Sequence, residues 1–549
     1  MRVYVPALLL LGLPGGGWAQ KEAAPATEAR AVRAFAAAAR DPLTLRALLG
    51  RMPKGADLHM HFSGAVYAET FLEEARTDLM CVDPAKKSLT KNLGTTRSIP
   101  PQPMCGDGQR RVEEAFSDQG FYDSLVDWFS MRSFVPSAGV SGHDQFFSTF
   151  DRYDPTHSAG ARHGGEWMDE IASRAAGQNE QYLEIMHTPD LGRAIAVAGT
   201  YVWSTEPRVK VAFEQDVTGT TEEALAAARS AMLGSAEFAR AVEADGAEFA
   251  KILADGRERE HCGTTEAARG CGVKVRFLFQ VLRANPPAVT FAQTLLGFEI
   301  ATREMEADGA EAKVVGINFV QPEDSRVAMA EYTRQMRMIG YLHRLYPKVH
   351  IALHAGELVE GLVPPDGLRF HIQQAVEVAG AERIGHGVDV MNEDGADALL
   401  KEMVERHVMV EMNLTSNDVI LGVTGVRQPL AVYQAAGVPV ALSTDDEGVS
   451  RIDLTHEYVR AATEFHLGYL DLKRMARTSL EHSFLPGASL WRTPGTFTTP
   501  GTACGTHAVL DASPSKACGV FLESNPRAAE EWEMERRFHV FESSLPNGI

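Results

Sequence analysis

The sequence predicts an α/β protein in which eight parallel strands close into a barrel of the (β/α)8 TIM type. Eight short segments rich in β-branched residues alternate with segments of helical periodicity, which is typical of repeated βα units. Several of these apolar segments stop at a polar cluster, and the carboxyl ends of barrel strands are where the polar residues of a site gather. The predicted strands are Asp57–His61, Tyr182–Met186, Val273–Leu282, Val314–Val320, His350–His354, Arg383–His386, Val408–Asn413 and Val438–Ser443.

Additional helices and insertions are expected around this barrel. A barrel of this type uses about 250 residues, whereas the chain has 549. Helical periodicity between strands is clear at Met329–Tyr346 and Gly395–Glu405. We place the insertions between the first and second strands, at the polar helical stretch Thr220–His261, and at the Gly/Thr/Pro-rich stretch Pro486–Gly519.

The composition excludes some classes of partner. With 45% hydrophobic and 23% charged residues the chain is an ordinary globular protein. Its formal net charge of -20 disfavours polyanions, because phosphate backbones and anionic membrane surfaces select for basic patches. We therefore expect no nucleic acid polymer as a partner, and a small neutral ligand is unaffected by this charge.

The first residues predict export. Arg2 precedes the apolar run Val5–Leu13, which is too short to span a bilayer, and Gly17–Ala19 supplies the small residues of a cleavage site. A cleaved signal peptide predicts a periplasmic or secreted protein, with an uncleaved amino-terminal anchor as the alternative. No later stretch approaches the roughly 20 apolar residues of a membrane helix, so stable membrane insertion is not expected.

The chain divides into four predicted regions. Residues 1–19 form the signal peptide, and 20–52 a linker followed by an alanine-rich helix at Glu28–Leu49. Residues 53–485 carry the barrel with its insertions. Residues 486–549 hold the Gly/Thr/Pro-rich excursion and a terminal helix at Pro526–Phe541, packed on the barrel.

Cysteine spacing agrees with an oxidising compartment. The six cysteines fall as three neighbouring pairs: Cys81 with Cys105, Cys262 with Cys271, and Cys504 with Cys518. Each pair encloses a surface-like stretch that a disulfide would pin. Six cysteines allow 15 connectivities, so nearest-neighbour pairing is a hypothesis, and unpaired thiols scattered by chance are the alternative.

The polar clusters at the strand ends indicate a metal site. His59 and His61 are two apart, so on a strand both imidazoles project from one face, as two ligands of one ion require. Later clusters follow apolar runs at His354, His386 and Asp445. Each has a plainer interpretation, because a lone barrel histidine is usually structural and paired aspartates often cap a helix. Their joint occurrence favours the metal site.

At these residues the chain resembles the adenosine deaminase family, within the metal-dependent amidohydrolase superfamily. The resemblance spans roughly Lys54 to Phe484. The secretory start, the insertions and the Ser483-Phe484-Leu485 stretch are more similar to the secreted, growth-factor-like branch. The motifs that carry the resemblance are Asp57 to His61, His354 to Glu357, Arg383 to Gly387 and Ser443 to Asp446.

The resemblance implies one zinc ion per chain and a hydrolytic deamination. The zinc ligands it implies are His59, His61, His354 and Asp445. Three neutral imidazoles and one carboxylate leave room for a water molecule, whose pKa the metal lowers toward neutrality. The implied reaction is attack of this activated water on purine C6, which converts adenosine or deoxyadenosine to the inosine product and ammonia.

Three further residues are implied to take part in the reaction. Glu357 would donate a proton to purine N1, which requires that its pKa be raised by the closed pocket. His386 would orient the water and take its proton. Asp446 would share a hydrogen bond with N7 and help to place the nucleophile. Gly356 joins Asp446 among the implied substrate contacts.

Two departures from the family pattern concern the substrate. Ser63 stands where the cytosolic enzymes have an aspartate that binds the ribose 5'-hydroxyl, and Gln321 stands where they have a glycine whose amide meets N3. A sibling amidohydrolase acting on another purine base, a modified nucleoside or an amide is therefore an alternative. A secreted binding or signalling protein that retains the barrel is a second one, and a homodimer is left open.

Four other histidines have no supporting motif. We expect them to be structural or surface residues: His187, His371, His456 and His482.

Overall fold

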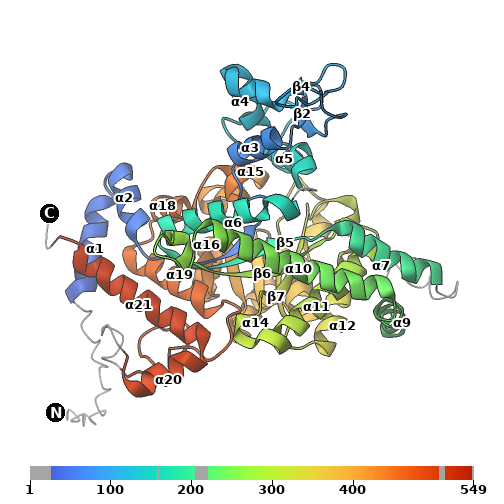
Figure 1. The fold of residues 1–549 in the computed structure, drawn as a ribbon. Helices are drawn as coiled ribbons and strands as arrows, with labels where there is room; N and C mark the ends of the chain where they lie inside the picture. The colour runs from blue at the N-terminus through green and yellow to red at the C-terminus, as the bar shows by residue number, and fades with distance from the viewer. Residues whose placement is uncertain (1–25, 158–159, 205–220, 506–513, 547–549) are drawn as a thin grey trace, which may run out of the picture.

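The computed structural model describes residues 26–157, 160–204, 221–505 and 514–546 (Figure 1). The predicted signal peptide at 1–19 and the start of the predicted linker lie outside the described residues.

Eight parallel strands form one sheet, and its spatial order follows their order along the chain. This arrangement confirms the eight predicted strands, because each one contains or overlaps a predicted segment. The strands are β1 Gly55–His61, β5 Glu180–His187, β6 Lys274–Leu282, β7 Val314–Val320, β8 His350–Ala355, β9 Arg383–His386, β10 Met409–Met412 and β11 Val440–Leu442.

The sheet curls until its last strand meets its first. An isolated parallel bridge pairs Met60 of β1 with Asp445, just beyond β11. The amide of Asp445 donates to the carbonyl of His59 at 2.9 Å, and the amide of His61 donates to the carbonyl of Asp445 at 3.2 Å. The (β/α)8 barrel is therefore confirmed, with a short seam between β11 and β1.

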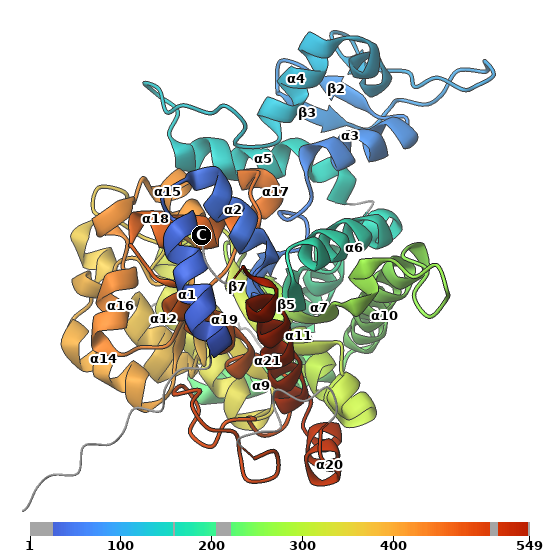
Figure 2. The ribbon, with the colours of Figure 1, turned by 90° about the vertical axis from the view of Figure 1, so that its left-hand side faces the viewer.

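Helices surround the strands, as Figures 1 and 2 show. Strands β1 and β7 are buried at every residue, as expected for a parallel sheet covered on its outer face. The predicted helices at Met329–Tyr346 and Gly395–Glu405 are α12 and α14. The surrounding helices are α6 Gly160–Gly177, α7 Leu191–Ser204, α9 Glu222–Leu233, α10 Ala236–Arg259, α11 Pro287–Asp308, α12 Arg326–Leu345, α13 His371–Gln374, α14 Ala396–Glu405, α15 Leu414–Leu421, α16 Leu430–Ala436, α17 Glu447–Ser450, α18 Leu454–Glu464 and α19 Tyr469–Glu481.

The prediction of one continuous helix at Glu28–Leu49 is wrong, because the helix is interrupted within this segment. The structure has two helices, α1 Ala26–Ala38 and α2 Pro42–Arg51. Asp41 lies in the break between the two helices. Its side chain caps α2 by accepting from the amide of Thr44 at 2.8 Å. Proline has no amide hydrogen and a fixed φ, so it suits the first position of a helix and not its interior.

The insertion between β1 and β5 holds a small sheet that the sequence did not predict. Strands β2 Cys81–Asp83, β3 Ser88–Thr90 and β4 Arg110–Arg111 form an antiparallel sheet with β2 in the centre. It projects from one end of the barrel (Figures 1 and 2). The helices of this insertion are α3 Ala68–Thr77, α4 Gln119–Trp128 and α5 Gly142–His157.

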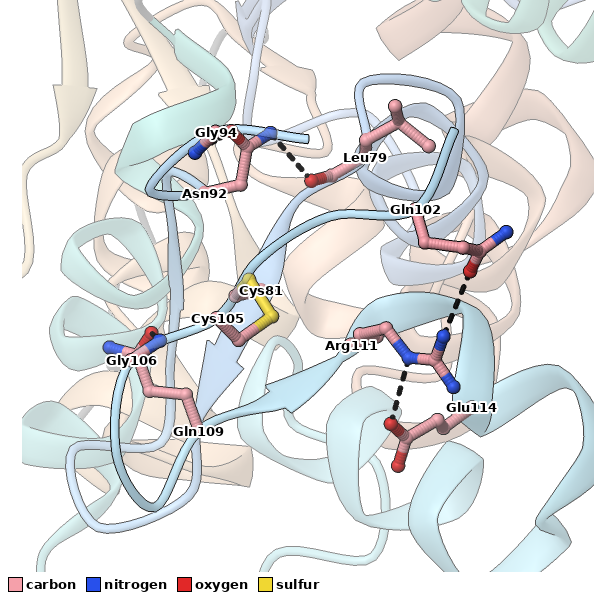
Figure 3. Close-up of a disulfide and its surroundings, with 10 residues drawn as sticks. All are labelled: Leu79, Cys81, Asn92, Gly94, Gln102, Cys105, Gly106, Gln109, Arg111 and Glu114. Carbon is pink, nitrogen blue, oxygen red and sulfur yellow. Dashed lines mark hydrogen bonds and ion pairs between the residues drawn. A yellow bond between two sulfur atoms is a disulfide. The ribbon is translucent and has the colours of Figure 1, made fainter. Parts of the chain in front are cut away.

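A disulfide between Cys81 and Cys105 anchors this sheet (Figure 3). It joins the first residue of β2 to a loop 24 residues later. Around it, the Asn92 side chain donates to the carbonyl of Leu79 at 2.8 Å, and Arg111 donates to Glu114 at 3.1 Å. Short strands with so few ladder bonds need such additional restraints.

The other two disulfides also follow the predicted pairing. Cys262 is joined to Cys271 after α10, and Cys504 to Cys518 near the carboxyl end. Nearest-neighbour pairing is thus confirmed at all six cysteines. The last disulfide lies in a small apolar cluster beside α20 Lys516–Ser524 and α21 Pro526–Ser544, which contains Leu490, Trp491 and Trp532.

Within the described ranges, no helix is long and apolar enough to cross a membrane. Short 3-10 turns and one π turn complete the described elements. They are η1 Val112–Ser117, η2 Arg269–Gly272, η3 Gly309–Glu311, η4 Pro365–Leu368, η5 Ala375–Ala379 (the π turn), η6 Val390–Asn392 and η7 Gly425–Arg427.

Candidate metal centre and active site

Four of the predicted site residues converge at one mouth of the barrel. His59 and His61 lie on β1, His354 lies on β8, and Asp445 follows β11. The Nε2 atom of His354 is 3.0 Å from Nε2 of His59 and 3.2 Å from Nε2 of His61. Oδ1 of Asp445 is 3.4 Å and 3.1 Å from the same two nitrogens. The four side chains thus present one donor atom each to a common point.

These separations fit a tetrahedral metal ion. With metal–nitrogen bonds of about 2.0–2.1 Å, the edges of a tetrahedron of ligands are roughly 3.3 Å long. Imidazole nitrogens held this close with no cation would set their lone pairs against one another. Oδ1 of Asp445 is buried and accepts no hydrogen bond from the part of the chain that the structure describes, which is costly for a carboxylate. The donor set therefore fits a zinc-like ion.

The outer nitrogen of each histidine is held by an acceptor from a different strand, and two of these three acceptors are fully buried. Nδ1 of His59 meets Oε2 of Glu411 at 2.6 Å. Nδ1 of His61 meets Oε1 of Gln280 at 2.8 Å, and Nδ1 of His354 meets Oδ1 of Asn318 at 2.8 Å. An acceptor at Nδ1 fixes the tautomer that leaves Nε2 free for a metal and fixes the plane of the ring.

The sequence analysis missed these three acceptors. Asn318 in β7 and Glu411 in β10 are each the lone polar residue of a short apolar strand, and Gln280 lies in the apolar second half of β6. A buried polar side chain must find a partner. A single amide or carboxylate facing the centre of a predicted barrel is therefore a signal that could have found them.

Glu357 and His386 lie beside the metal ligands. Nε2 of His386 is 3.8 Å from Oε1 of Glu357 and 3.9 Å from Oδ2 of Asp445. Nδ1 of His386 is held by Oδ1 of Asn417 at 2.9 Å. Nε2 of His386 thus faces the cluster of candidate ligands, and the predicted roles of Glu357 and His386 stay predictions.

Burial shifts both residues in the direction that proton transfer needs. Burial, with the charge of Asp445 second, raises the pKa of Glu357 to about 8. Burial lowers the pKa of His386 to about 4, although the charge of Asp445 opposes it. At neutral pH Glu357 is therefore a proton donor and His386 a proton acceptor.

Asp446 is packed against the end of β1. A Cβ atom on Gly64 would lie 1.4 Å from its Oδ1, so the glycine makes room for this carboxyl group. Oδ1 of Asp446 has no hydrogen-bond partner among the described residues, and burial raises its pKa well above the ordinary value. The predicted contact of Asp446 with a substrate stays a prediction.

Gln321 stands at a position whose backbone conformation favours glycine. Its φ of +80° is in the region that favours glycine. Its side chain turns away to accept from the amide of Ala284 at 2.8 Å. Ser63 is partly exposed just beyond β1, and Gly356 follows β8 with a φ of +73°. The predicted substrate contacts of these residues stay predictions.

Comparison with known proteins shows which family part of this chain matches. Residues 257–490 match the model of the family described as adenosine deaminase. The adenosine deaminase of Clostridium perfringens (strain ATCC 13124) is 32% identical over 168 residues, 30% of this chain and 43% of that protein. The adenosine deaminase of Escherichia coli (strain SE11) is 34% identical over 137 residues, 25% and 38% of the two chains. The matched part spans about two fifths of these relatives.

Solved structures match over more of the chain but at lower sequence identity. The N6-methyl-AMP deaminase of Arabidopsis thaliana has a TM-score of 0.49 and 18% identity, and covers 80% of this chain and 94% of its own. The adenine deaminase of Arthrobacter aurescens has a TM-score of 0.46 and 16% identity, over 79% of this chain and 94% of its own.

The fold and the ligand cluster define a parallel β/α barrel with a candidate metal centre at one mouth. Residues 257–490 match the adenosine deaminase family, and the relatives at 32% and 34% identity match over 30% and 25% of this chain. The match over 257–490 contains His354, Glu357, His386, Asp445 and Asp446. It does not separate the growth-factor-like branch from the others.

Proposed function

We propose that this protein is a zinc-dependent aminohydrolase that converts adenosine, and also deoxyadenosine, to the inosine product and ammonia. The observation that carries this proposal is the convergence of His59, His61, His354 and Asp445 beside Glu357 and His386. The match to the adenosine deaminase family supports hydrolytic deamination of a purine. That the metal is zinc and that the substrate carries a ribose or deoxyribose are parts of the proposal.

The four ligands would hold the metal, which, when bound, lowers the pKa of water toward neutrality. Glu357 is protonated at neutral pH and would donate to purine N1, which makes C6 electrophilic. His386 is neutral and would take the proton of the attacking water. Asp446 would place the purine through N7. Ammonia leaves after its nitrogen has been protonated.

A second substrate class is favoured by one observation. Ser63 has a shorter, neutral side chain at the position where cytosolic enzymes bind the ribose 5'-hydroxyl. A sibling activity on another purine base, a modified nucleoside or an amide fits that change. A binding protein without activity fits less well, since it has no physical need to keep Glu357, His386 and Asp446 around the ligands.

A substrate panel tests this proposal. The purified protein, analysed for its metal content, is incubated with adenosine, deoxyadenosine, adenine and an N6-substituted adenosine, with and without a chelator. We expect loss of adenosine absorption that the chelator abolishes. A faster rate on adenine or the substituted nucleoside would favour the sibling activity. A metal-loaded protein inert toward every compound would reject the deaminase proposal.

We also propose that the protein is exported, to the periplasm or the medium. Three disulfides support this, because disulfides persist in oxidising compartments. Cell fractionation and the amino-terminal sequence of the mature protein test it. A cytoplasmic protein that starts at Met1 would contradict it. A purine nucleoside as small-molecule partner and a homodimer stay predictions.

A further inference from the structure

Buried side chains of three neighbouring elements hold the segment from His354 to Glu357 in place. We call this set of contacts the grip. Arg283 follows β6, Glu323 follows β7, and His371 begins α13. All three are at most 1% exposed. Arg283 and Glu323 contact the backbone of the segment that carries both a candidate metal ligand and the proposed proton donor, and His371 contacts Glu323.

Glu323 makes the central contacts of this grip. Its Oε2 accepts from the amide of Glu357 at 2.8 Å, and its Oε1 accepts from the amide of Gly356 at 3.1 Å. Burial alone would raise the pKa of Glu323, but the charge and ring N–H of His371 outweigh it and hold the pKa at about 2. Glu323 is therefore a carboxylate that offers four lone pairs and no hydrogen.

His371 and Arg283 fix the other sides of the grip. Nδ1 of His371 meets Oε1 of Glu323 at 2.5 Å. The His371 ring stacks on Tyr332 at 3.7 Å, and the Tyr332 hydroxyl donates to the carbonyl of His371 at 2.8 Å. Arg283 donates to the carbonyl of His354 at 3.2 Å and to that of Gln321 at 3.0 Å.

We propose that Glu323 is a positioning residue for Glu357, and that His371 acts through it by holding the carboxylate in place. This inference rests on the proposed function. The consecutive backbone amides of Gly356 and Glu357 both donate to one carboxylate. This fixes the direction in which the side chain of Glu357 leaves the backbone. Displacement of a reacting group by 1 Å can cost about 10²-fold in rate.

A purely structural role makes a different prediction. A buried carboxylate that only stabilised the loop would, when changed, lower the free energy of unfolding and leave the folded enzyme at full speed. A positioning residue changes kcat in protein that is folded and metal-loaded, with a smaller effect on KM.

The test uses the variants Glu323→Gln and His371→Asn in the full chain. Glutamine keeps the length of the side chain. Its NH2 group is a donor, however, so two donors would face each other at one of the three hydrogen bonds that Glu323 accepts. Glu531→Gln is the matched control. Glu531 is also a buried glutamate that accepts from a backbone amide, that of Leu490 at 2.6 Å, and it lies on α21, outside the strands that carry the candidate ligands.

Two measurements are made on each variant. Hydrogen exchange of the peptide that covers Gly356 and Glu357 reports the grip without any substrate. Values of kcat and KM, with metal content beside them, report its consequence. For Glu323→Gln we expect exchange of these two amides to rise at least tenfold, kcat to fall by about 100-fold, and KM to stay within about threefold. His371→Asn should give a smaller change of the same kind.

The outcomes are distinct. Unchanged exchange in Glu323→Gln, or faster exchange with kcat within about twofold of the wild type, overturns the inference. If that variant does not fold, His371→Asn decides by the same criteria. A wild-type protein inert toward every purine rejects the proposed function instead, and the exchange measurement still shows whether Glu323 holds the segment. Glu531→Gln should leave both measurements unchanged.

Discussion

At the scale of single residues, three residues at the mouth of the barrel have a strained backbone. Gln321, His386 and Asp445 each follow or end a strand with φ between +60° and +80°. Such conformations are uncommon for residues other than glycine and cost free energy. Here each one turns the chain just past a strand end, and this turn aims the His386 and Asp445 side chains at the ligand cluster.

Glu357 should be essential for turnover and dispensable for the metal. Its carboxyl group is 3.8 Å from His386 and is not among the four converging ligands. Glu357→Gln removes the acidic proton but keeps the size of the side chain. We expect kcat to fall by about 10³-fold or more, with metal content unchanged. Undiminished turnover in this variant would reject the proposed mechanism.

The pH profile should have its working range between the pKa values of these two residues. Glu357 must be protonated, and its pKa is raised to about 8, so activity should be lost as the pH rises through 8. His386 must be neutral, and its pKa is lowered to about 4, so activity should be lost only as the pH falls toward 4. The measurement is kcat against pH; a rate that climbs steadily beyond pH 9 would contradict the role of Glu357.

Asn318 should matter for metal affinity although it does not reach the metal. It holds Nδ1 of His354 at 2.8 Å. Asn318→Ala leaves that ring free to rotate, and loss of such a partner typically weakens metal binding 10–100-fold. Titration with a competing chelator measures it. Asn92→Ala, in the insertion of Figure 3, is the control and should leave the affinity unchanged.

At the scale of elements, the strands were predictable because each is short, apolar and bounded by polar residues. The boundary between α1 and α2 was less clear, since residues with good helix propensity stand on both sides of Asp41 and Pro42. The small sheet of β2, β3 and β4 has two or three residues in each strand. Such strands are too short to show alternation, so the sequence could not reveal them.

The Cys81–Cys105 disulfide should stabilise this insertion and leave the chemistry alone. It closes a loop of 24 residues, and loss of such a crosslink costs about 3 kcal/mol. The double variant Cys81→Ser, Cys105→Ser should be cleaved faster by proteases between β3 and β4 while kcat stays unchanged. Equal resistance to proteolysis in variant and wild type would count against this role.

At the scale of the whole molecule, the metal ligands lie across the seam of the barrel. Apart from the Met60–Asp445 bridge, β1 meets the end of β11 through Asp57, whose carboxylate accepts from the amide and hydroxyl of Thr444. An ion held by His59 and His61 on one side and Asp445 on the other ties the first strand to the last. Closure of the barrel and metal binding should therefore be coupled.

Metal removal should lower thermal stability as well as activity. A ligand present at 1,000 times its dissociation constant stabilises the folded state by about 4 kcal/mol. For a chain of this length we expect a chelator to lower Tm by roughly 5 °C, with recovery on addition of zinc. Differential scanning calorimetry measures it. An unchanged Tm in protein shown to have lost its metal would mean that the seam does not depend on the ion.

The sequence by itself determined the strand pattern and the barrel, because periodicity and strand-end position are local properties of the chain. It also pointed to the polar clusters at the strand ends, whereas the full ligand set and the roles of Glu357 and His386 were implied by the resemblance to the adenosine deaminase family and stay predictions. It also indicated the disulfide pairing, since each pair is close in sequence. The tertiary structure alone decided which side chains support the ligands. Gln280, Asn318, Glu411 and the buried Glu323–His371 pair act on residues of other strands, and such contacts between distant segments exist only once the barrel has closed.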